Sequence, residues 1–391
     1  MLRGLLAILI CGCINTSEKP RDDTDIVDTD TDIDDTDEPA VDCAAISPDP
    51  AEVETWYDHS NPSLTDDLDE LLPTATPASE EFDETLLEEA IAEYAALPYT
   101  WSLLVLRHGN LIVERYYHGA DAATSNAVHS SSKSILSLLT GLAIEQGHLE
   151  GLDQPVAHIL PEVFKGLEAE KQNITVRHLL TMTSGIRWSE DSTEYKIEDE
   201  ENWLRAYLER SLDEPPGTYF EYSTGSTHLL GAAVAEATGT DLCTYAHQNI
   251  LVPLQAEAER WQRDKQGYYS GGYGVYLTPR ELARFGQMVA NGGLWQGTQV
   301  VPSSFVEAAV SWHEDTGGRW GYGYLFWIWR PNKEDLSSAV AWGYGGQLVY
   351  IVAAHDLVVV TTTNTRDQDP DFDGMDLVRG IVAALPPGSA K

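Results

Sequence analysis

The sequence predicts an α+β fold with a helical subdomain, and three features of the residue pattern indicate it. A helix and a strand hairpin come first, the chain from about 150 to 265 is mainly helical, and the last third returns to apolar strands. With 391 residues, 42% of them apolar, the chain can bury a large hydrophobic core. We therefore expect one folded body from about 80 to 387, with an α/β part at 80–150 and 265–387 and a helical part at 150–265.

The first thirteen residues have the pattern of an export signal. Arg3 precedes the apolar run from Leu5 to Ile10, which is too short to cross a membrane as a helix. The run leads into Cys11-Gly12-Cys13, and a small residue directly before a cysteine resembles the lipobox of bacterial lipoproteins. The resemblance implies that 1–13 is a lipoprotein signal peptide with a lipidated Cys13. The protein is then exported and anchored to a membrane, facing the periplasm or the cell surface. An ordinary signal peptide and a short buried segment are the alternatives.

The segment 14–79 is expected to be a disordered acidic tether. Between Asn15 and Asp42 it is rich in Asp and Thr, so it cannot bury enough apolar surface to fold, and its like charges keep it extended. Much of the formal net charge of −39 lies in this part of the chain. Nucleic-acid phosphates repel a chain this acidic, so we expect no nucleic-acid partner. Cys43 and Cys243 lie far apart in sequence, and whether they pair stays open.

Folded structure is expected to begin near Glu80. Apolar residues such as Leu87 and Ile91 recur at helical spacing in 80–97, with acidic residues on the other face. The stretch from Thr100 to Gly119 predicts two strands around a turn at 107–110.

The stretch from His129 to Gly147 carries the candidate nucleophile, Ser130. A run of small hydroxyl residues is followed by an apolar helix, so Ser130 lies where a helix begins, near free backbone N–H groups. Lys133 shares a face with Ser130 because residues at i and i+3 are neighbours on a helix. An ammonium group in an apolar interior loses hydration, so its pKa falls and the amine can take the serine proton. The pair is therefore a candidate nucleophile and base, although Ser-x-x-Lys alone also occurs by chance.

The rest of the chain predicts helices and then strands. The expected elements are helices within 174–188, 201–212 and 226–238, a helix from Pro279 to Asn291, a strand at 322–330, a strand pair at 339–364 and a helix at 375–385. Gly239 closes the third of these helices, and Pro279 suits the first turn of the fourth. We expect the loops 188–202 and 255–269 to shape the substrate pocket.

Five stretches, in order along the chain, carry a family resemblance. They are HSSSKS, NITVRHLLTMTSGI, PGTYFEYSTGSTHLLG, LTPRELARFGQMVANGG and WGYGGQ, within a region of similarity from about 80 to 387. Together they resemble the serine β-lactamase and penicillin-binding-protein superfamily, in its class C-like branch near the 6-aminohexanoate-oligomer hydrolases and family esterases. The resemblance implies a β-lactamase/DD-peptidase-like fold, in which helices flank an antiparallel sheet and a helical subdomain is inserted.

The resemblance also implies roles for the first two motifs. Ser130 is the nucleophile and Lys133 its base. Tyr222 matches the tyrosine of the family's Tyr-x-Asn motif, and a phenol whose pKa falls beside a positive charge can pass the proton to the leaving group. Thr224 stands where relatives have an asparagine that helps bind the substrate amide, which argues against β-lactam recognition.

The third motif of the family corresponds to Tyr344-Gly345-Gly346, on the strand that lines the site. Glycines allow the substrate to approach the strand backbone closely. The resemblance implies that the backbone N–H of Gln347 pairs with that of Ser130 as an oxyanion hole. Tyr344 puts no positive charge where relatives hold a substrate carboxylate, which favours a neutral ester or amide.

These residues predict a serine hydrolase that cleaves an ester or amide bond through an acyl-enzyme on Ser130, with Lys133 and Tyr222 as acid and base. The enzymatic alternative is a β-lactamase or D-alanyl carboxypeptidase that acts on cell-wall peptide. The other alternative is a non-catalytic surface binding module that keeps the fold.

The expected partners are a small-molecule or peptide-like ester or amide substrate and, through the lipid anchor, a membrane; the sequence does not indicate an oligomeric state. No metal and no organic cofactor is expected. The sequence contains no His-Glu-x-x-His motif, and we expect scattered histidines such as His178 and His228 to be structural.

Overall fold

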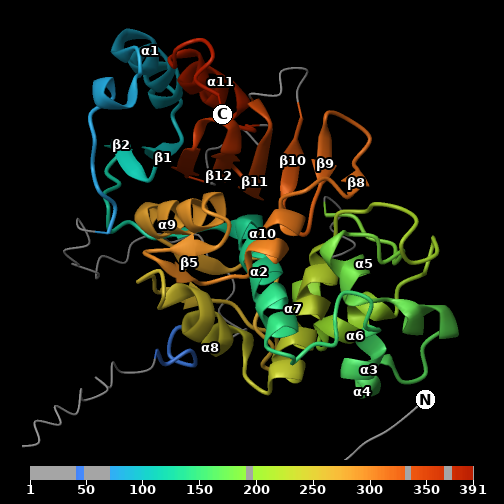
Figure 1. Ribbon diagram of the computed structural model, residues 1–391. Coiled ribbons are helices and arrows are strands. Elements are labelled where there is room, and N and C mark those ends of the chain that lie inside the picture. Colours follow the sequence, from blue (N-terminus) through green and yellow to red (C-terminus); the bar gives the residue numbers. More distant parts are fainter. Residues whose placement is uncertain (1–40, 48–70, 191–196, 331–335, 365–371, 391) are drawn as a thin grey trace, which may run out of the picture. The chain divides into compact units, whose positions relative to one another are not determined.

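An eight-stranded antiparallel sheet is the central element of the computed structural model, which describes residues 41–47, 71–190, 197–330, 336–364 and 372–390 (Figure 1). The strand order is β2-β1-β13-β12-β11-β10-β9-β8, and each neighbouring pair is antiparallel. The strands are β1 (Thr100–Arg107), β2 (Asn110–Tyr116), β8 (Glu314–Asp315), β9 (Trp320–Tyr322), β10 (Trp327–Trp329), β11 (Ser338–Gly343), β12 (Gln347–Val352) and β13 (Leu357–Thr363). The antiparallel sheet that the family resemblance implied is confirmed.

Successive residues of the central strands face two different cores. On β1, Leu104 and Leu106 join the larger core, whereas Leu103 and Val105 join the smaller one, because side chains alternate across a strand. The helices α1 (Glu84–Ala95) and α11 (Met375–Ala383) pack together over the smaller core (Figure 1).

The helix α9 (Pro279–Ala290) lies against β1, β12 and β13 on the other face of the sheet. Thr278 and Glu281 form a capping box at its start, and Pro279 occupies its first turn, as the sequence predicted. A Cβ atom on Gly286 would lie 2.6 Å from Val349 and 2.7 Å from Val358. Glycine at this position therefore allows the helix to approach the sheet closely.

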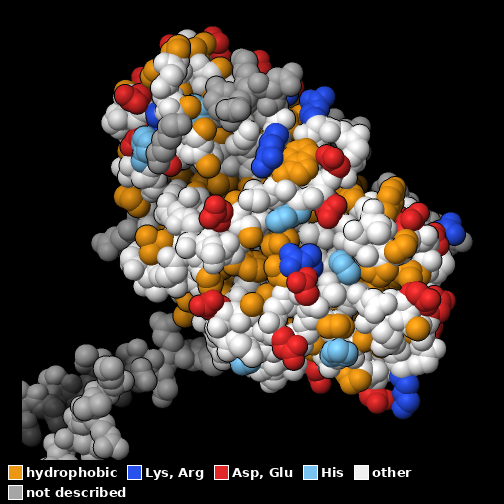
Figure 2. Space-filling view, turned by 45° about the vertical axis from the view of Figure 1, so that its right-hand side comes forward, with side chains coloured by type: hydrophobic (Ala, Val, Ile, Leu, Met, Phe, Trp, Pro, Cys, Tyr) orange, Lys and Arg blue, Asp and Glu red, His pale blue; other side chains and the backbone are white. Residues whose placement is uncertain are grey.

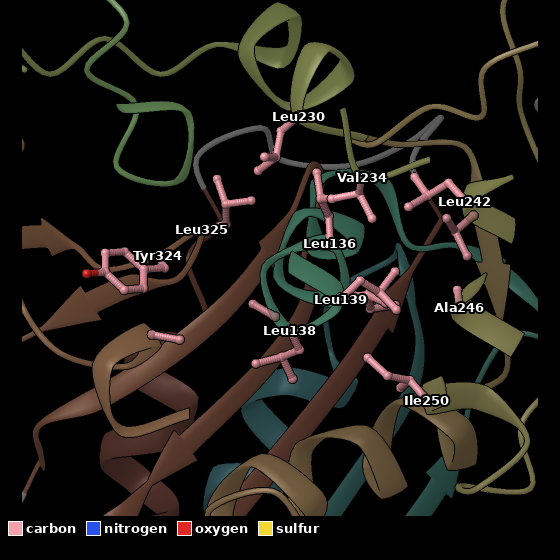
Figure 3. Close-up of a cluster of buried hydrophobic side chains, with 14 of the residues drawn as sticks. Leu136, Leu138, Leu139, Leu230, Val234, Leu242, Ala246, Ile250, Tyr324 and Leu325 are labelled. Atoms are coloured by element: carbon pink, nitrogen blue, oxygen red, sulfur yellow. The ribbon is translucent and has the colours of Figure 1, made fainter. Parts of the chain in front are cut away.

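Helices, joined by long loops, are the main regular structure in the middle of the chain. They are α2 (Ser132–Glu145), α3 (Val156–Ile159), α4 (Pro161–Phe164), α5 (Val176–Leu180), α6 (Trp203–Leu208), α7 (Thr224–Thr238) and α8 (Leu242–Ala246), and α10 (Ser303–Ala309) follows later. Figure 3 shows how α2 joins this part to the sheet: Leu136 and Leu139 lie among apolar side chains of α7 and α8, such as Val234 and Leu242. The candidate nucleophile Ser130 thus precedes a helix that is buried along most of its length.

Two small sheets complete the described structure. One has the order β3-β5-β4, with β3 (Asn126–Ala127) directly before the candidate nucleophile, and β5 (Val275–Leu277) and β4 (Arg260–Trp261) beside it. The other pairs β6 (Leu294–Trp295) with β7 (Thr298–Gln299).

The first predicted elements are confirmed. Asp83 accepts hydrogen bonds from two backbone N–H groups at the start of α1. The predicted hairpin is β1 and β2, and its turn holds His108 and Gly109 at φ values of 50° and 81°. Such left-handed values at both central residues match the twist of the two flanking strands.

The prediction of one strand at 322–330 was wrong. The chain turns back between β9 and β10, where the N–H of Gly323 donates to the carbonyl of Phe326 over 2.8 Å. Leu325 adopts a left-handed φ of 58°, which no strand residue has. The expected strand pair at 339–364 is likewise three strands, β11, β12 and β13.

Part of the predicted tether is folded against the domain, which corrects the expectation of disorder throughout 14–79. Cys43 forms a disulfide with Cys243, and its carbonyl accepts a 2.6 Å hydrogen bond from the Tyr269 hydroxyl. Near the other end of the predicted tether, the N–H of Ala75 donates to the carbonyl of Leu111 on β2. A covalent link and backbone hydrogen bonds compensate here for the low apolar content. Residues 1–40, including Cys13, lie outside the described residues.

Charged side chains are spread over the face shown in Figure 2 and do not gather there in one patch of a single sign. In the described ranges, no helix is both long enough and apolar enough to cross a bilayer.

Candidate active site

Ser130 lies in a 3₁₀ turn, His129–Ser131, directly before α2, and not in the first turn of the helix itself. The neighbouring hydroxyl of Ser131 donates to the carbonyl of Gln347 over 2.6 Å and to that of Ala341 over 3.1 Å. These contacts hold the turn against β11 and β12. Ser130 itself is partly exposed and lines a cavity, so a substrate can reach its hydroxyl.

Lys133 is only 1% exposed, and its ammonium nitrogen contacts Ser130 as the sequence predicted. Nζ donates to Ser130 Oγ over 2.9 Å, to Thr224 Oγ1 over 3.0 Å and to the carbonyl of Gly272 over 2.8 Å. Burial lowers the pKa of Lys133 to about 8, although the nearby charge of Glu190 acts in the opposite direction. The expected fall in this pKa is confirmed. At pH 7 about a tenth of the side chains are then neutral amines that can accept a proton.

Gly272 was not found from the sequence, because any residue type can supply a backbone carbonyl. A Cβ atom at this position would lie 2.6 Å from Thr227 Oγ1 and 3.3 Å from Lys133 Nζ. A methyl group here would therefore force Thr227 to shift and would crowd the lysine head group.

Tyr222 comes just before α7, whose first turn Ser223 caps by accepting from the N–H of Ser226. Its ring packs on Trp327, with centroids 5.4 Å apart, and Lys133 Nζ lies 5.1 Å from the Tyr222 ring centroid. The structure thus brings Tyr222 to the serine–lysine pair.

The expected fall in the pKa of Tyr222 was wrong. Burial raises this pKa above its ordinary value, and the charge of Glu190 raises it further, while a hydrogen bond with Ser130 lowers it in part. The ammonium group of Lys133 contacts the face of the ring, so it does not stabilise a charge on the phenol oxygen strongly. Tyr222 is therefore a neutral phenol at ordinary pH.

A cavity of about 640 Å³ opens beside Ser130. Its described lining consists of His129, Ser130, Trp188, Ser189, Glu190, Ile197, Glu198, Tyr222, Thr224, Tyr273, Trp320, Trp327, Trp342 and Tyr344. Four of the predicted site residues are among these: Ser130, Tyr222, Thr224 and Tyr344. The loop 188–202 contributes to the lining as expected, whereas the loop 255–269 does not, and Tyr273, a few residues after it, does.

The other predicted residues around the serine, Lys133, Gly345, Gly346 and Gln347, do not line the cavity. Gly345 and Gly346 have φ values of 80° and 101° and form the turn between β11 and β12. The side chain of Gln347 is buried and donates to the carbonyl and hydroxyl of Thr363, both over 2.9 Å. Any contact of Gln347 with a substrate must therefore come from its backbone.

Glu190 is a site residue that sequence reasoning missed. Its Oε1 accepts a 2.7 Å hydrogen bond from Trp188 Nε1 and another from the N–H of Thr224. Through these bonds the loop carboxylate is placed near Lys133 and Tyr222, whose pKa values it raises. No local motif marks it, because its two partners come from its own loop and from the start of α7.

Three tryptophans of neighbouring strands form an aromatic wall of the cavity. Trp320, Trp327 and Trp342 come from β9, β10 and β11, and their ring centroids lie 5.1–6.3 Å apart. Antiparallel pairing of the strands brings them together. Trp327 on β10 pairs with Val340 on β11, and Trp342 lies two residues further along β11.

The structural interpretation of two histidines agrees with their contacts. His178 completes a capping box at the start of α5, where its Nδ1 accepts from the N–H of Thr175 over 3.2 Å. His228 is buried and lies 3.0 Å from the carboxylate of Asp264.

The structure also answers the open question of the cysteines, because Cys43 and Cys243 are paired. His247 lies beside them and could complete a group of three metal donors. The two sulfur atoms are bonded to each other, however, so they are not thiolate ligands.

The fold and the site together define a class. An antiparallel sheet, a helical part and a buried lysine that contacts a serine three residues earlier are the features of the β-lactamase and penicillin-binding-protein type of serine hydrolase. The chain belongs to the beta-lactamase family, whose model matches residues 88–384.

Similar proteins agree with this assignment. The chain is 26% identical over 299 residues to a 6-aminohexanoate-dimer hydrolase of Paenarthrobacter ureafaciens, which covers 69% of this chain and 74% of that protein. Among solved structures, a putative 6-aminohexanoate-dimer hydrolase from Bacillus anthracis superposes with a TM-score of 0.66 at 19% identity, covering 86% of this chain and 94% of the other. The hydrolase EstCE1, described as having promiscuous acyltransferase activity, superposes with a TM-score of 0.63 at 18% identity, covering 76% and 97%. At these identities the structural likeness shows the fold.

Proposed function

We propose that this family member cleaves an ester or amide bond through an acyl-enzyme on Ser130. The observation that carries the proposal is the 2.9 Å contact between Ser130 Oγ and Lys133 Nζ, in a place where burial lowers the pKa of the lysine to about 8. A desolvated amine next to a reachable hydroxyl is what nucleophilic catalysis by serine requires.

The reaction begins when Ser130 Oγ attacks the substrate carbonyl and Lys133 takes its proton. Tyr222, a neutral phenol within hydrogen-bond reach of Ser130, relays this proton: it gives its own proton to the leaving alcohol or amine and takes back the one held by Lys133. The backbone N–H groups of Ser130 and Gln347 stabilise the oxyanion, and the hydrogen bond from Ser131 to Gln347 keeps their two segments together. Water then hydrolyses the acyl-enzyme and restores Ser130.

Two features support an ester or amide over a β-lactam. The hydroxyl of Thr224, where relatives have an asparagine, already accepts from Lys133. Tyr344 is uncharged and 55% exposed at the cavity. The names of two similar proteins, a 6-aminohexanoate-dimer hydrolase and the hydrolase EstCE1, support the same choice.

The test compares hydrolysis of a short-chain p-nitrophenyl ester and of a chromogenic cephalosporin by the wild type, Ser130→Ala and Ser132→Ala. We expect Ser130→Ala to lose at least about a thousandfold of the ester turnover. Ser132→Ala removes the hydroxyl two positions away, which contacts only the carbonyl of His129, and it retains most of the turnover. Full ester turnover in Ser130→Ala contradicts the mechanism, and rapid cephalosporin turnover favours the β-lactamase alternative.

We further propose that the protein is exported and anchored to a membrane through lipidated Cys13. Support comes from the signal-like first residues and from the disulfide between Cys43 and Cys243, since disulfides persist mainly in oxidising compartments outside the cytosol.

A further inference from the structure

The carbonyl of Gly272, which accepts from Lys133, belongs to the segment that joins β4 to β5. Ser270, whose side chain is completely buried, organises this segment. Its hydroxyl accepts from the N–H groups of Gly272 and Tyr273, both over 3.3 Å. Lys133 Nζ donates to the Gly272 carbonyl over 2.8 Å. The position of this acceptor, and with it the position of the amine, therefore depends on Ser270.

Trp261, on β4, contacts both Ser270 and the N-terminal segment 41–47. Its indole Nε1 donates to the carbonyl of Ser270 over 2.8 Å, and its backbone N–H donates to the carbonyl of Ile46 over 3.3 Å. The side chain is buried, so water does not compete for the indole hydrogen bond. Trp261 thus links the segment 41–47 to the residue that organises the acceptor of Lys133.

Tyr269 makes a second contact with the same segment. Its hydroxyl donates to the carbonyl of Cys43 over 2.6 Å, and its ring packs edge to face on Trp261, with centroids 6.2 Å apart. Cys43 is bonded to Cys243 on α8, beside which the segment lies in Figure 1. The disulfide therefore fixes the carbonyl that Tyr269 binds.

These contacts form one continuous path from the disulfide to the proposed base, through Cys43, Tyr269, Trp261, Ser270, Gly272 and Lys133. The same small sheet also contacts the segment of the nucleophile. The N–H of Val128, two residues before Ser130, donates to the carbonyl of Val275 on β5 over 2.9 Å. A displacement of β4 and β5 would consequently act on the serine and on the lysine together.

We propose that the disulfide-anchored segment 41–47 is a positioning element of the active site, which acts on Lys133 through Tyr269 and the Gly272 carbonyl. Tyr269 is a positioning residue, because it acts through Gly272. The inference rests on the proposed function, in which Lys133 is the base. It also gives the loop 255–269 a role in supporting the lysine, although this loop does not line the cavity.

The first test is Tyr269→Phe, which removes the hydroxyl but keeps the ring that packs on Trp261. With the p-nitrophenyl ester we expect kcat to fall by about threefold to tenfold while KM changes little, because the base is displaced and the cavity is kept. Tyr245→Phe is the matched control. It removes a phenol hydroxyl on α8, two residues from Cys243, which donates to Gln146 over 2.8 Å. This variant should keep the kcat of the wild type.

The pH profile of kcat/KM gives a readout that a general loss of stability would not move. Burial is the main cause that lowers the pKa of Lys133 to about 8, so water admitted by a loosened Gly272 segment raises this pKa. Glu190 and Tyr222 face the lysine from other segments and remain in place in the variant. The rising limb of the profile should therefore move to higher pH in Tyr269→Phe and stay in place in Tyr245→Phe.

The second test is Cys43→Ser/Cys243→Ser, measured under conditions in which circular dichroism shows folded protein. Both cysteines are buried, so substitution breaks the link more cleanly than an added reductant. We expect kcat to fall by at least about tenfold. Adding Tyr269→Phe to this double variant should cost less than it does in the wild type, because both changes interrupt one path.

A kcat and a pH profile in Tyr269→Phe that match the wild type overturn the inference, and so does an equal loss in Tyr245→Phe. Ser130-dependent turnover leaves the proposed function standing in either case. If no ester is hydrolysed, the proposed function fails and amide hydrogen exchange of residues 262–274 decides the inference. Faster exchange in Tyr269→Phe than in Tyr245→Phe supports the coupling of the segment to the Gly272 carbonyl, and equal exchange contradicts it.

Discussion

The hydroxyl of Ser131 donates a 2.6 Å hydrogen bond to the carbonyl of Gln347, a residue 216 positions later in the chain. This contact joins the turn that holds the nucleophile to the first residue of β12. The geometry of the proposed oxyanion hole therefore depends on a side chain that is not itself part of it.

We predict that Ser131→Ala lowers the free energy of unfolding by about 1–3 kcal/mol, because two buried acceptors lose a donor. The turnover number should fall while KM changes little, since the N–H donors shift relative to each other. Urea denaturation and steady-state kinetics measure the two effects. Ser311→Ala, which removes an exposed serine hydroxyl far along the chain, is the control. Unchanged turnover in Ser131→Ala would show that the contact does not position the site.

The pH dependence of kcat/KM should follow the ionisation of Lys133. The base must be neutral, and its folded pKa is about 8, so activity rises with pH and levels off above about 8. Removing the nearby negative charge with Glu190→Gln lowers the pKa of Lys133, because that charge favours the ammonium form. The rising limb of the profile should therefore move to lower pH in this variant. A shift in the opposite direction would contradict Lys133 as the base.

Gly272→Ala should inactivate the enzyme without unfolding it. The new methyl group would lie 3.3 Å from Lys133 Nζ and closer still to Thr227, so it displaces the lysine head group from Ser130. We expect a loss of turnover of at least about a hundredfold, measured with the p-nitrophenyl ester. Gly318→Ala is the matched control, since a Cβ atom there meets nothing within 4 Å. Circular dichroism of both variants separates inactivation from unfolding.

Loss of the disulfide should destabilise the domain. The bond closes a loop with a sequence separation of 200 residues, and removing it raises the conformational entropy of the unfolded chain. We predict that Cys43→Ser/Cys243→Ser lowers the free energy of unfolding by about 2–5 kcal/mol. Reduced wild type is the control, and it should unfold at the same urea concentration as the double variant. Equal stability of oxidised and reduced protein would contradict the prediction.

Cys13→Ala should abolish membrane anchoring. In a bacterial host, we expect the wild type to incorporate labelled palmitate and to sediment with membranes, while Cys13→Ala does neither. Cys11→Ala leaves the cysteine of the lipobox-like motif in place and serves as the control. Labelling that persists in Cys13→Ala would refute lipidation at this position.

Much of the fold could be predicted because short segments determine it. The helix spacing of 80–97 and the turn at His108 and Gly109 depend on neighbouring residues, and both predictions are confirmed. The stretch 322–330 was misassigned because contacts with distant residues determine its structure. Its apolar and aromatic residues suit a strand, and only contacts with other segments, such as the hydrogen bond from the N–H of Leu325 to the carbonyl of Leu180, turn it into a hairpin.

The same division applies to the site. The sequence by itself determined that Ser130 and Lys133 meet, because they are three positions apart on one face of a helical turn. Tertiary structure decided the surroundings. Lys133 contacts Thr224 and Gly272 across sequence separations of 91 and 139 residues, and Glu190 and the tryptophans of β9, β10 and β11 come from separate segments.

The pKa values of Lys133 and Tyr222 show most directly why the sequence determines one property of the site and the tertiary structure another. Burial of any lysine in an apolar helix lowers its pKa, so the direction could be predicted for Lys133. For Tyr222 the direction depended first on how completely its hydroxyl is buried and then on which charged group lies near it, and the sequence contains neither. The folded chain buries the phenol and places Glu190 within reach, while Lys133 lies over the ring face, so the phenol keeps its proton.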